Sequence, residues 1–172
     1  VQQFWNPLNT ADFSPYLAQI QNLNPDVVFS METGADAARF IQQWANFGLK
    51  GKIPVLYCQN ATDQSVIRTL GAEAENLISG AHFCEGRDDP ANNKFIADYE
   101  KAYSKLPSIY GFSHYSGAMW LGEAIKRAEG KIEDKDNFLK IVRGIELVDS
   151  PLGKKVSLDA YGNPVYDVFI RR

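Results

Sequence analysis

Residues 24–60, NPDVVFSMETGADAARFIQQWANFGLKGKIPVLYCQN, decide the fold because they contain one complete strand, helix, strand crossover. The apolar run at 27–31 is short and does not alternate, which is typical of a strand covered on both faces of a parallel sheet. Apolar residues then repeat at spacings of three and four from 37 to 45, and Gly48 is suited to end that helix. Residues 53–58 form a second buried-type run. The sequence therefore predicts an α/β fold with a Rossmann-like, mostly parallel sheet flanked by helices.

The ends of these two strands are the candidate binding region. In open α/β sheets the ligand crevice lies outside the carboxyl ends of the strands. The residues that follow the two predicted strands are therefore the expected ligand contacts: Met31, Glu32, Thr33, Gly34, Tyr57, Cys58, Gln59 and Asn60.

Length and composition restrict the class of protein. With 172 residues, of which 45% are apolar, the chain suffices for one core, or for one and a half domains at most. The formal charge of −3 and the absence of a Lys/Arg run argue against nucleic acid or an anionic membrane surface as the main partner. No apolar run reaches the ~18 to 20 residues of a transmembrane helix. Val1 is neither an initiator Met nor the start of a signal peptide, so we expect a processed or truncated chain.

The rest of the chain continues the alternation of strands and helices and then changes. Residues 1–5 are predicted as a strand, and Phe13, Leu17, Ile20 and Leu23 mark the buried face of a first helix. Further elements are expected as follows: a helix at 61–70 with Val66, Ile67 and Leu70 inward; a strand at 76–84; helices at 91–106, 109–130 and 134–144, the second with Tyr115, Met119, Gly122 and Ile125 on one stripe; and a C-terminal β-hairpin with arms at 156–159 and 165–170.

Catalytic and metal-binding motifs are not evident. The segment GLKGKI at 48–53 resembles a phosphate-binding loop only superficially, because it does not match GxxxxGK[ST] and precedes a strand. His82 and His114 fall in no recognised ligand set, so no metal and no cofactor are expected. Cys58 lies between a strand and a helix, as a nucleophile elbow does, but LYCQN lacks the flanking glycines. A hydrolase-like enzyme using Cys58 is thus the less favoured alternative, and we expect no enzymatic activity.

Across almost its whole length the sequence resembles the type I periplasmic solute-binding proteins of ABC importers, in the branched-chain amino acid receptor group. The order and spacing of five segments carry the resemblance: DFSPYLAQIQNLNPDVVF, GLKGKIPVL, LGAEAENLISGAHF, NNKFIADYEKAY and SPLGKKVSLDAYGNPVYDVFI. Such receptors have two α/β lobes joined by three crossing strands, and they close on a solute between the lobes. The resemblance identifies this chain with the C-terminal half of such a receptor.

The resemblance also implies a division of the chain. Residues 1–108 would form the second-lobe α/β segment with ligand-facing strand ends, 109–148 the helices that normally pack on the first lobe, and 149–172 a hairpin that returns to the second lobe. A periplasmic or extracytoplasmic location and a membrane permease as partner are implied as well. Helices without their partner lobe would expose an apolar face, so the fragment is expected to self-associate. A structural or interaction module without a small-molecule ligand is the other alternative.

The residues at the predicted site leave the solute class open. Thr33 stands where amino-acid receptors of this group carry an aromatic residue, and residues 57–59 stand where they carry the acid that meets the α-ammonium. Glu32 has two readings: a replacement charge that meets the ammonium of a branched-chain amino acid, or a solvated carboxylate at a helix N-terminus. Without an ammonium partner, an aromatic or aliphatic carboxylate fits equally, held by backbone N–H groups at helix N-termini and by Tyr57.

The two cysteines, Cys58 and Cys84, end two of the predicted strands at the same rim of the sheet. A disulfide between them is geometrically allowed if the strands are neighbours and the side chains share a face. Parallel neighbours are rarely bridged, so we expect two free thiols.

Overall fold

The computed structural model describes all 172 residues, which form two compact units. Unit 1 consists of Val1–Ala81 together with Ile170–Arg172, and unit 2 of His82–Phe169. The chain therefore passes from one unit to the other twice, after Ala81 and after Phe169. The α/β class predicted from the sequence is confirmed, whereas the lobe boundaries at residues 108 and 148 stay a prediction.

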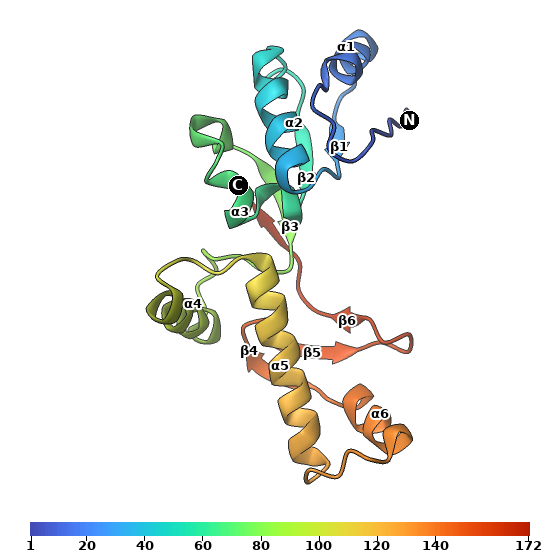
Figure 1. Ribbon diagram of the computed structural model, residues 1–172, viewed down its shortest axis with the longest axis vertical. Coiled ribbons are helices and arrows are strands. Elements are labelled where there is room, and N and C mark those ends of the chain that lie inside the picture. Colours follow the sequence, from blue (N-terminus) through green and yellow to red (C-terminus); the bar gives the residue numbers. More distant parts are fainter. The chain divides into compact units, whose positions relative to one another are not determined.

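Unit 1 is built on a four-stranded sheet with the order β1-β2-β3-β7 (Figure 1). The pairs β1·β2 and β2·β3 are parallel, with Ser30 beside Tyr57 and Tyr57 beside Ser79. This confirms the parallel sheet predicted from residues 24–60. The strands are β1 (Val28–Ser30), β2 (Val55–Cys58), β3 (Ile78–Ala81) and β7 (Phe169–Arg171).

The helices of unit 1 share one apolar core with the sheet. The elements are α1 (Ser14–Leu23), α2 (Gly34–Asn46), the 3-10 turn η1 (Gln59–Thr62), the short α3 (Gln64–Ile67) and the 3-10 turn η2 (Gly71–Ala74). Of the predicted inward faces, Phe13, Leu17 and Ile20 of the first helix and Ala37, Phe40, Ile41 and Trp44 of α2 are all buried in this core. Leu23 was also expected inward, but it is 55% exposed because α1 ends there and Asn24 turns into the left-handed region.

Only one face of the unit 1 sheet is covered by these helices. Val55 and Tyr57 of β2 belong to the core, whereas Leu56 between them is exposed. Phe29 pairs with Leu56 across β1 and β2 and is exposed as well. On β7, Ile170 is 77% exposed. The sequence pattern predicts that both faces of the sheet are buried, but the face that carries Phe29, Leu56 and Ile170 is bare. This bare face bears on the assembly of the protein.

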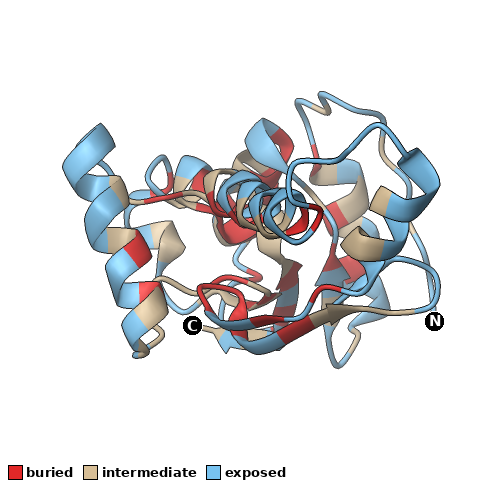
Figure 2. Ribbon diagram, turned by 90° about the horizontal axis from the view of Figure 1, so that it is seen from below, coloured by how far each residue is buried: buried red, intermediate tan, exposed pale blue.

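Unit 2 contains α4 (Pro90–Tyr103), α5 (Ile109–Arg127) and α6 (Lys135–Arg143), and a second sheet of antiparallel strands in the order β4-β5-β6. Its core is aromatic at the centre, where the rings of Phe83 and Phe112 stack with centroids 4.4 Å apart. Figure 2 colours such buried residues red and the solvent-facing sides of the helices pale blue. The strands are β4 (Leu147–Ser150), β5 (Gly153–Leu158) and β6 (Pro164–Val165). No helix of either unit combines the length and the apolar character needed to cross a membrane.

Four element predictions for the chain ends and the middle need correction. Residues 1–5 are not a strand and pair with none of the strands of unit 1, although β1 lies at the edge of the sheet. The single helix expected at 61–70 is broken: Asp63 is extended and its side chain accepts a hydrogen bond from the Ser65 amide at 3.0 Å, which starts α3 anew. The strand expected at 76–84 is shorter and consists of β3 alone.

On α5 the buried residues are Ile109, Phe112, Ser116 and Ala124, and the expected Tyr115 and Ile125 are each 44% exposed.

The C-terminal hairpin is confirmed at its turn and wrong in its second arm. Ser157 pairs with Val165 and Leu158 with Pro164, and the pairing ends after Val165, where the chain leaves this sheet. Residues 169–171 instead join the parallel sheet of unit 1 as β7. The strand β4, which pairs with β5, is not predicted from the sequence.

Candidate functional site

The two predicted turns lie side by side at the carboxyl edge of the unit 1 sheet. Ser30, the last residue of β1, pairs with Tyr57 of β2, so the segments that follow them leave the sheet at the same edge. The Cys58 thiol donates to the Glu32 carbonyl at 3.3 Å and ties the turns together. Met31, Thr33 and Gly34 are exposed, whereas Glu32, Cys58, Gln59 and Asn60 are half-buried.

Tyr57 differs from the other predicted residues because its ring lies in the core. The residue is only 4% exposed, and its ring meets that of Phe40 on α2 edge to face, with centroids 6.5 Å apart. Burial raises the pKa of the Tyr57 hydroxyl far above its usual range. The Tyr57 ring is therefore part of the core between the sheet and α2.

The helix α2 begins at the first turn and presents its N-terminus there. Thr33 is the N-cap residue and has an extended backbone, but its side chain makes no capping hydrogen bond. Gly34 follows with φ of +55°, a conformation that residues with an L side chain adopt rarely. The first N–H groups of a helix have no intrahelical partner and favour an anion. This end of α2 can therefore accept a carboxylate, provided that Asp36 in the first turn is neutralised.

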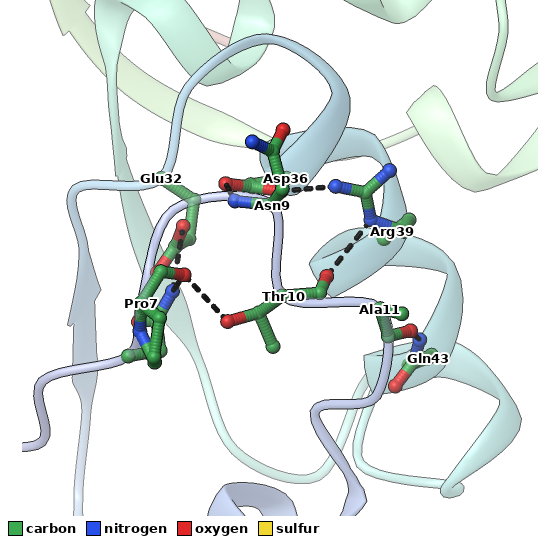
Figure 3. Close-up of polar contacts among 9 residues, drawn as sticks. Pro7, Asn9, Thr10, Ala11, Glu32, Asp36, Arg39 and Gln43 are labelled. Carbon is green, nitrogen blue, oxygen red and sulfur yellow. Dashed lines mark hydrogen bonds and ion pairs between the residues drawn. The ribbon is translucent and has the colours of Figure 1, made fainter.

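Arg39 of α2 balances the charge of Asp36, and the loop at residues 6–13 adds hydrogen bonds to this end of the helix, a contact that was not recognised from the sequence (Figure 3). Glu32, Asp36, Arg39 and Gln43 recur every three or four residues and form a polar stripe opposite the loop. Asp36 pairs with Arg39 and also accepts a hydrogen bond from the backbone of Asn9 at 2.9 Å. The remaining contacts of the stripe are Asn6 Nδ2 to Glu32 Oε2 at 3.4 Å, Arg39 Nε to the Thr10 carbonyl at 2.9 Å, Gln43 Nε2 to the Ala11 carbonyl at 2.9 Å, and the Phe13 amide to Gln43 Oε1 at 2.7 Å.

Glu32 is the acidic group of the candidate site. Burial raises its pKa above the usual value, the charge of Asp36 raises it further, and the hydrogen bond from Asn6 opposes both. A carboxylate in this position attracts a solute ammonium and repels a solute carboxylate. Its protonation state is consequently relevant to which solute class the turns accept.

A second missed residue is Arg171, which comes from the far end of the chain. Its guanidinium donates from Nη2 to the Thr62 carbonyl at 3.0 Å and from Nη2 to Thr62 Oγ1 at 2.6 Å. The turn η1, which contains the predicted residues Gln59 and Asn60, is therefore attached to β7. Pairing between residues so distant in the sequence leaves no local signal.

The remaining candidates for metal binding or catalysis in the sequence are the histidines and the cysteines. No group of three or more His, Cys, Asp and Glu side chains is placed to hold a metal ion. His82 Nε2 lies 3.2 Å from Ser113 Oγ, and His114 Nδ1 lies 2.7 Å from the Tyr110 carbonyl. Cys58 and Cys84 are both free thiols. A hollow of about 360 Å³ in unit 1 is lined mostly by residues at the amino ends of β2 and β3, such as Pro54 and Asn76, and Tyr57 is the one predicted site residue in its lining.

Solved structures with the same fold include two at more than a quarter identity. An ABC transporter substrate-binding protein from Sphaerobacter thermophilus is 28% identical, with a TM-score of 0.89 over 96% of this chain and 45% of that chain. A solute binding protein of an ABC transporter from Rhodopseudomonas palustris HaA2, in complex with p-hydroxybenzoic acid, is 27% identical, with a TM-score of 0.86 over 96% of this chain and 45% of that chain.

Curated relatives give the same assignment. The Leu/Ile/Val-binding protein homolog 6 of Brucella melitensis biotype 1 is 30% identical over 160 residues, which are 89% of this chain and 40% of that protein. The chain thus spans less than half the length of the proteins that it matches. The family described as "Periplasmic binding protein" matches residues 1–172. The family match covers every residue, and the fold is that of the type I binding proteins of ABC transporters. The chain therefore belongs to the periplasmic binding protein family.

Proposed function

We propose that this chain is part of the extracytoplasmic solute-binding component of an ABC importer, and that residues 31–34 and 57–60 contact a small organic solute. The observation that carries the proposal is the juxtaposition of the two turns at the carboxyl edge, joined by the contact from Cys58 to Glu32. The names of the relatives support it. The receptor delivers its solute to a membrane permease and performs no catalytic turnover.

The chain supplies part of the solute site, and residues elsewhere in the receptor complete it. In this proposal residues 1–108 are the second-lobe segment, residues 109–148 are helices that pack on the first lobe, and residues 149–172 return to the second lobe. The solute shifts the receptor from an open to a closed state to the extent that it binds the closed state more tightly.

The solute belongs to one of two classes, which the site distinguishes by charge. A relative named for Leu, Ile and Val supports a branched-chain amino acid, whose ammonium would meet Glu32. A structural neighbour that holds p-hydroxybenzoic acid supports an aromatic or aliphatic carboxylate. That anion would meet the N-terminus of α2 beside Thr33 and Gly34. Met31, exposed beside these residues, supplies apolar surface for either class.

Equilibrium binding tests the proposal on the receptor that contains these residues. Titration calorimetry with leucine, isoleucine, valine, benzoate and hydroxybenzoates should give saturable binding to one class and no product. Glu32→Gln then sorts the classes: an ammonium solute should lose about 1.5–3 kcal/mol, the range for a hydrogen bond to a charged group, and a carboxylate solute should bind equally or more tightly. Glu100→Gln, the same change at an exposed residue of α4 outside the two turns, is the matched control. A receptor that binds neither class, or that converts either one, would contradict the proposal.

A further inference from the structure

The C-terminal strand holds the solute-contacting turn through one arginine. The turn η1 has Gln59 at its start and Thr62 at its end. Arg171 Nη2 donates to the Gln59 carbonyl at 3.4 Å and to the Thr62 carbonyl at 3.0 Å. One guanidinium therefore bridges both ends of the turn.

Hydroxyl groups extend the attachment into the sheet. Arg171 Nη2 donates to Thr62 Oγ1 at 2.6 Å, and Nε donates to Ser79 Oγ at 3.4 Å. Thr62 and Ser79 are 8% and 2% exposed, and their hydroxyl oxygens lie 2.7 Å from each other. Ser79 is a residue of β3, so the guanidinium joins β7, β3 and η1 in a buried polar network. A hydrogen bond is electrostatically stronger in such surroundings than in water.

We propose that Arg171 is a positioning residue that fixes η1, so that Gln59 and Asn60 keep the geometry in which they contact the solute. The inference rests on the proposed function of this turn. Arg171 itself acts through the turn and needs no contact with the solute. Its planar group offers several donors in one rigid arrangement, and the single ammonium of a lysine cannot reproduce it.

The chain provides a matched control in the next residue. Arg172 lies on the same strand end, and its Nη2 donates to Asn76 Oδ1 at 3.1 Å, at an exposed position before β3. Arg171→Lys and Arg172→Lys are equal in chemistry and retain the charge of the chain. Net charge and long-range attraction are the same in the two variants. A difference between their effects therefore comes from the hydrogen-bond network around η1.

Two measurements on the receptor that contains these residues test the inference. Hydrogen exchange of the amides of residues 59–62 should accelerate about tenfold or more in Arg171→Lys, while exchange in α2 and in Arg172→Lys stays at the wild-type rate. The dissociation constant for the solute, measured well below the melting temperature, should rise on the order of tenfold in Arg171→Lys and stay within about twofold in Arg172→Lys. Faster exchange with an unchanged dissociation constant would reduce Arg171 to a structural role and overturn the inference, as would unchanged exchange.

If the proposed function is wrong, these measurements give a result that differs from the failure of the inference about Arg171. A wild-type receptor that binds no tested solute overturns that function, and hydrogen exchange, which needs no solute, then decides whether Arg171 fixes the turn. Ser79→Ala provides a second variant should Arg171→Lys fail to fold. It removes one hydroxyl of the network, and it should accelerate exchange at η1 less than Arg171→Lys does.

Discussion

Tyr57 shows how a single residue can satisfy the rule for a site and belong to the core as well. It stands at a strand end, where the sequence predicts a solute contact, yet its side chain is buried in the core against Phe40. The alternation of a strand sends successive side chains to opposite faces, and position in the sequence does not reveal which face is the core.

Truncation of Tyr57 separates these roles. Tyr57→Ala should lower the free energy of unfolding by about 3–5 kcal/mol, because a buried ring is lost and a cavity remains. Tyr57→Phe keeps the ring and should cost about 1 kcal/mol or less. Chemical denaturation measures both. An alanine variant that keeps its stability but loses roughly 1–3 kcal/mol of solute binding would instead place the ring in the solute wall.

Glu32 makes the stability of unit 1 depend on pH in a defined direction. Its folded-state pKa lies above its ordinary 4.5, chiefly because of burial. Below pH 4.5 Glu32 is protonated in both the folded and the unfolded state, so it does not affect stability. As the pH rises through the raised pKa, the folded state must hold a charge that the unfolded state accommodates more easily. The free energy of unfolding therefore falls.

The variant Glu32→Gln should therefore be more stable than wild type at neutral pH, and the difference should shrink to zero as the pH falls below 4.5. The glutamine carbonyl still accepts the hydrogen bond from Asn6, so only the charge is changed. Urea denaturation at a series of pH values measures the difference. A variant that is equally stable at every pH, or less stable at neutral pH, would show that the carboxylate is not penalised in the folded state.

At the scale of elements, the sequence predicts what is encoded locally. The βαβ crossover and the buried faces of α1 and α2 follow from period and turn residues, and the structure confirms them. The same signals place the two turns of the candidate site at one edge, since parallel strands share their carboxyl ends.

Elements that depend on distant partners could not be predicted in this way. The run at residues 165–170 has strand character, but its composition does not say that Phe169–Arg171 joins β3 and leaves the hairpin. In α5 both the expected and the observed stripes have helical spacing, because the helix is apolar around much of its circumference. The contact of residues 6–13 with α2 also joins segments about 30 residues apart. Long-range pairing decides each of these cases.

For the whole molecule, the bare face of the unit 1 sheet has the largest consequence. Parallel sheets occur with both faces covered, yet one face here exposes apolar side chains from three of its strands. The exposed residues are Phe29 on β1, Leu56 on β2 and Ile170 on β7, at 66%, 43% and 77%. Exposed apolar surface of this kind marks an interaction site.

We therefore expect the 172-residue chain, expressed alone, to self-associate through this face. Burying a Phe side chain is worth about 1.5–3 kcal/mol, so Phe29→Ser should weaken association on the order of tenfold or more. Light scattering coupled to size-exclusion chromatography over a range of concentrations measures it. Leu8→Ser is the control, because Leu8 is 87% exposed but belongs to the N-terminal loop and not to the sheet. A chain that stays monomeric at every concentration, or one in which Leu8→Ser weakens association as much as Phe29→Ser does, would show that this face does not drive assembly.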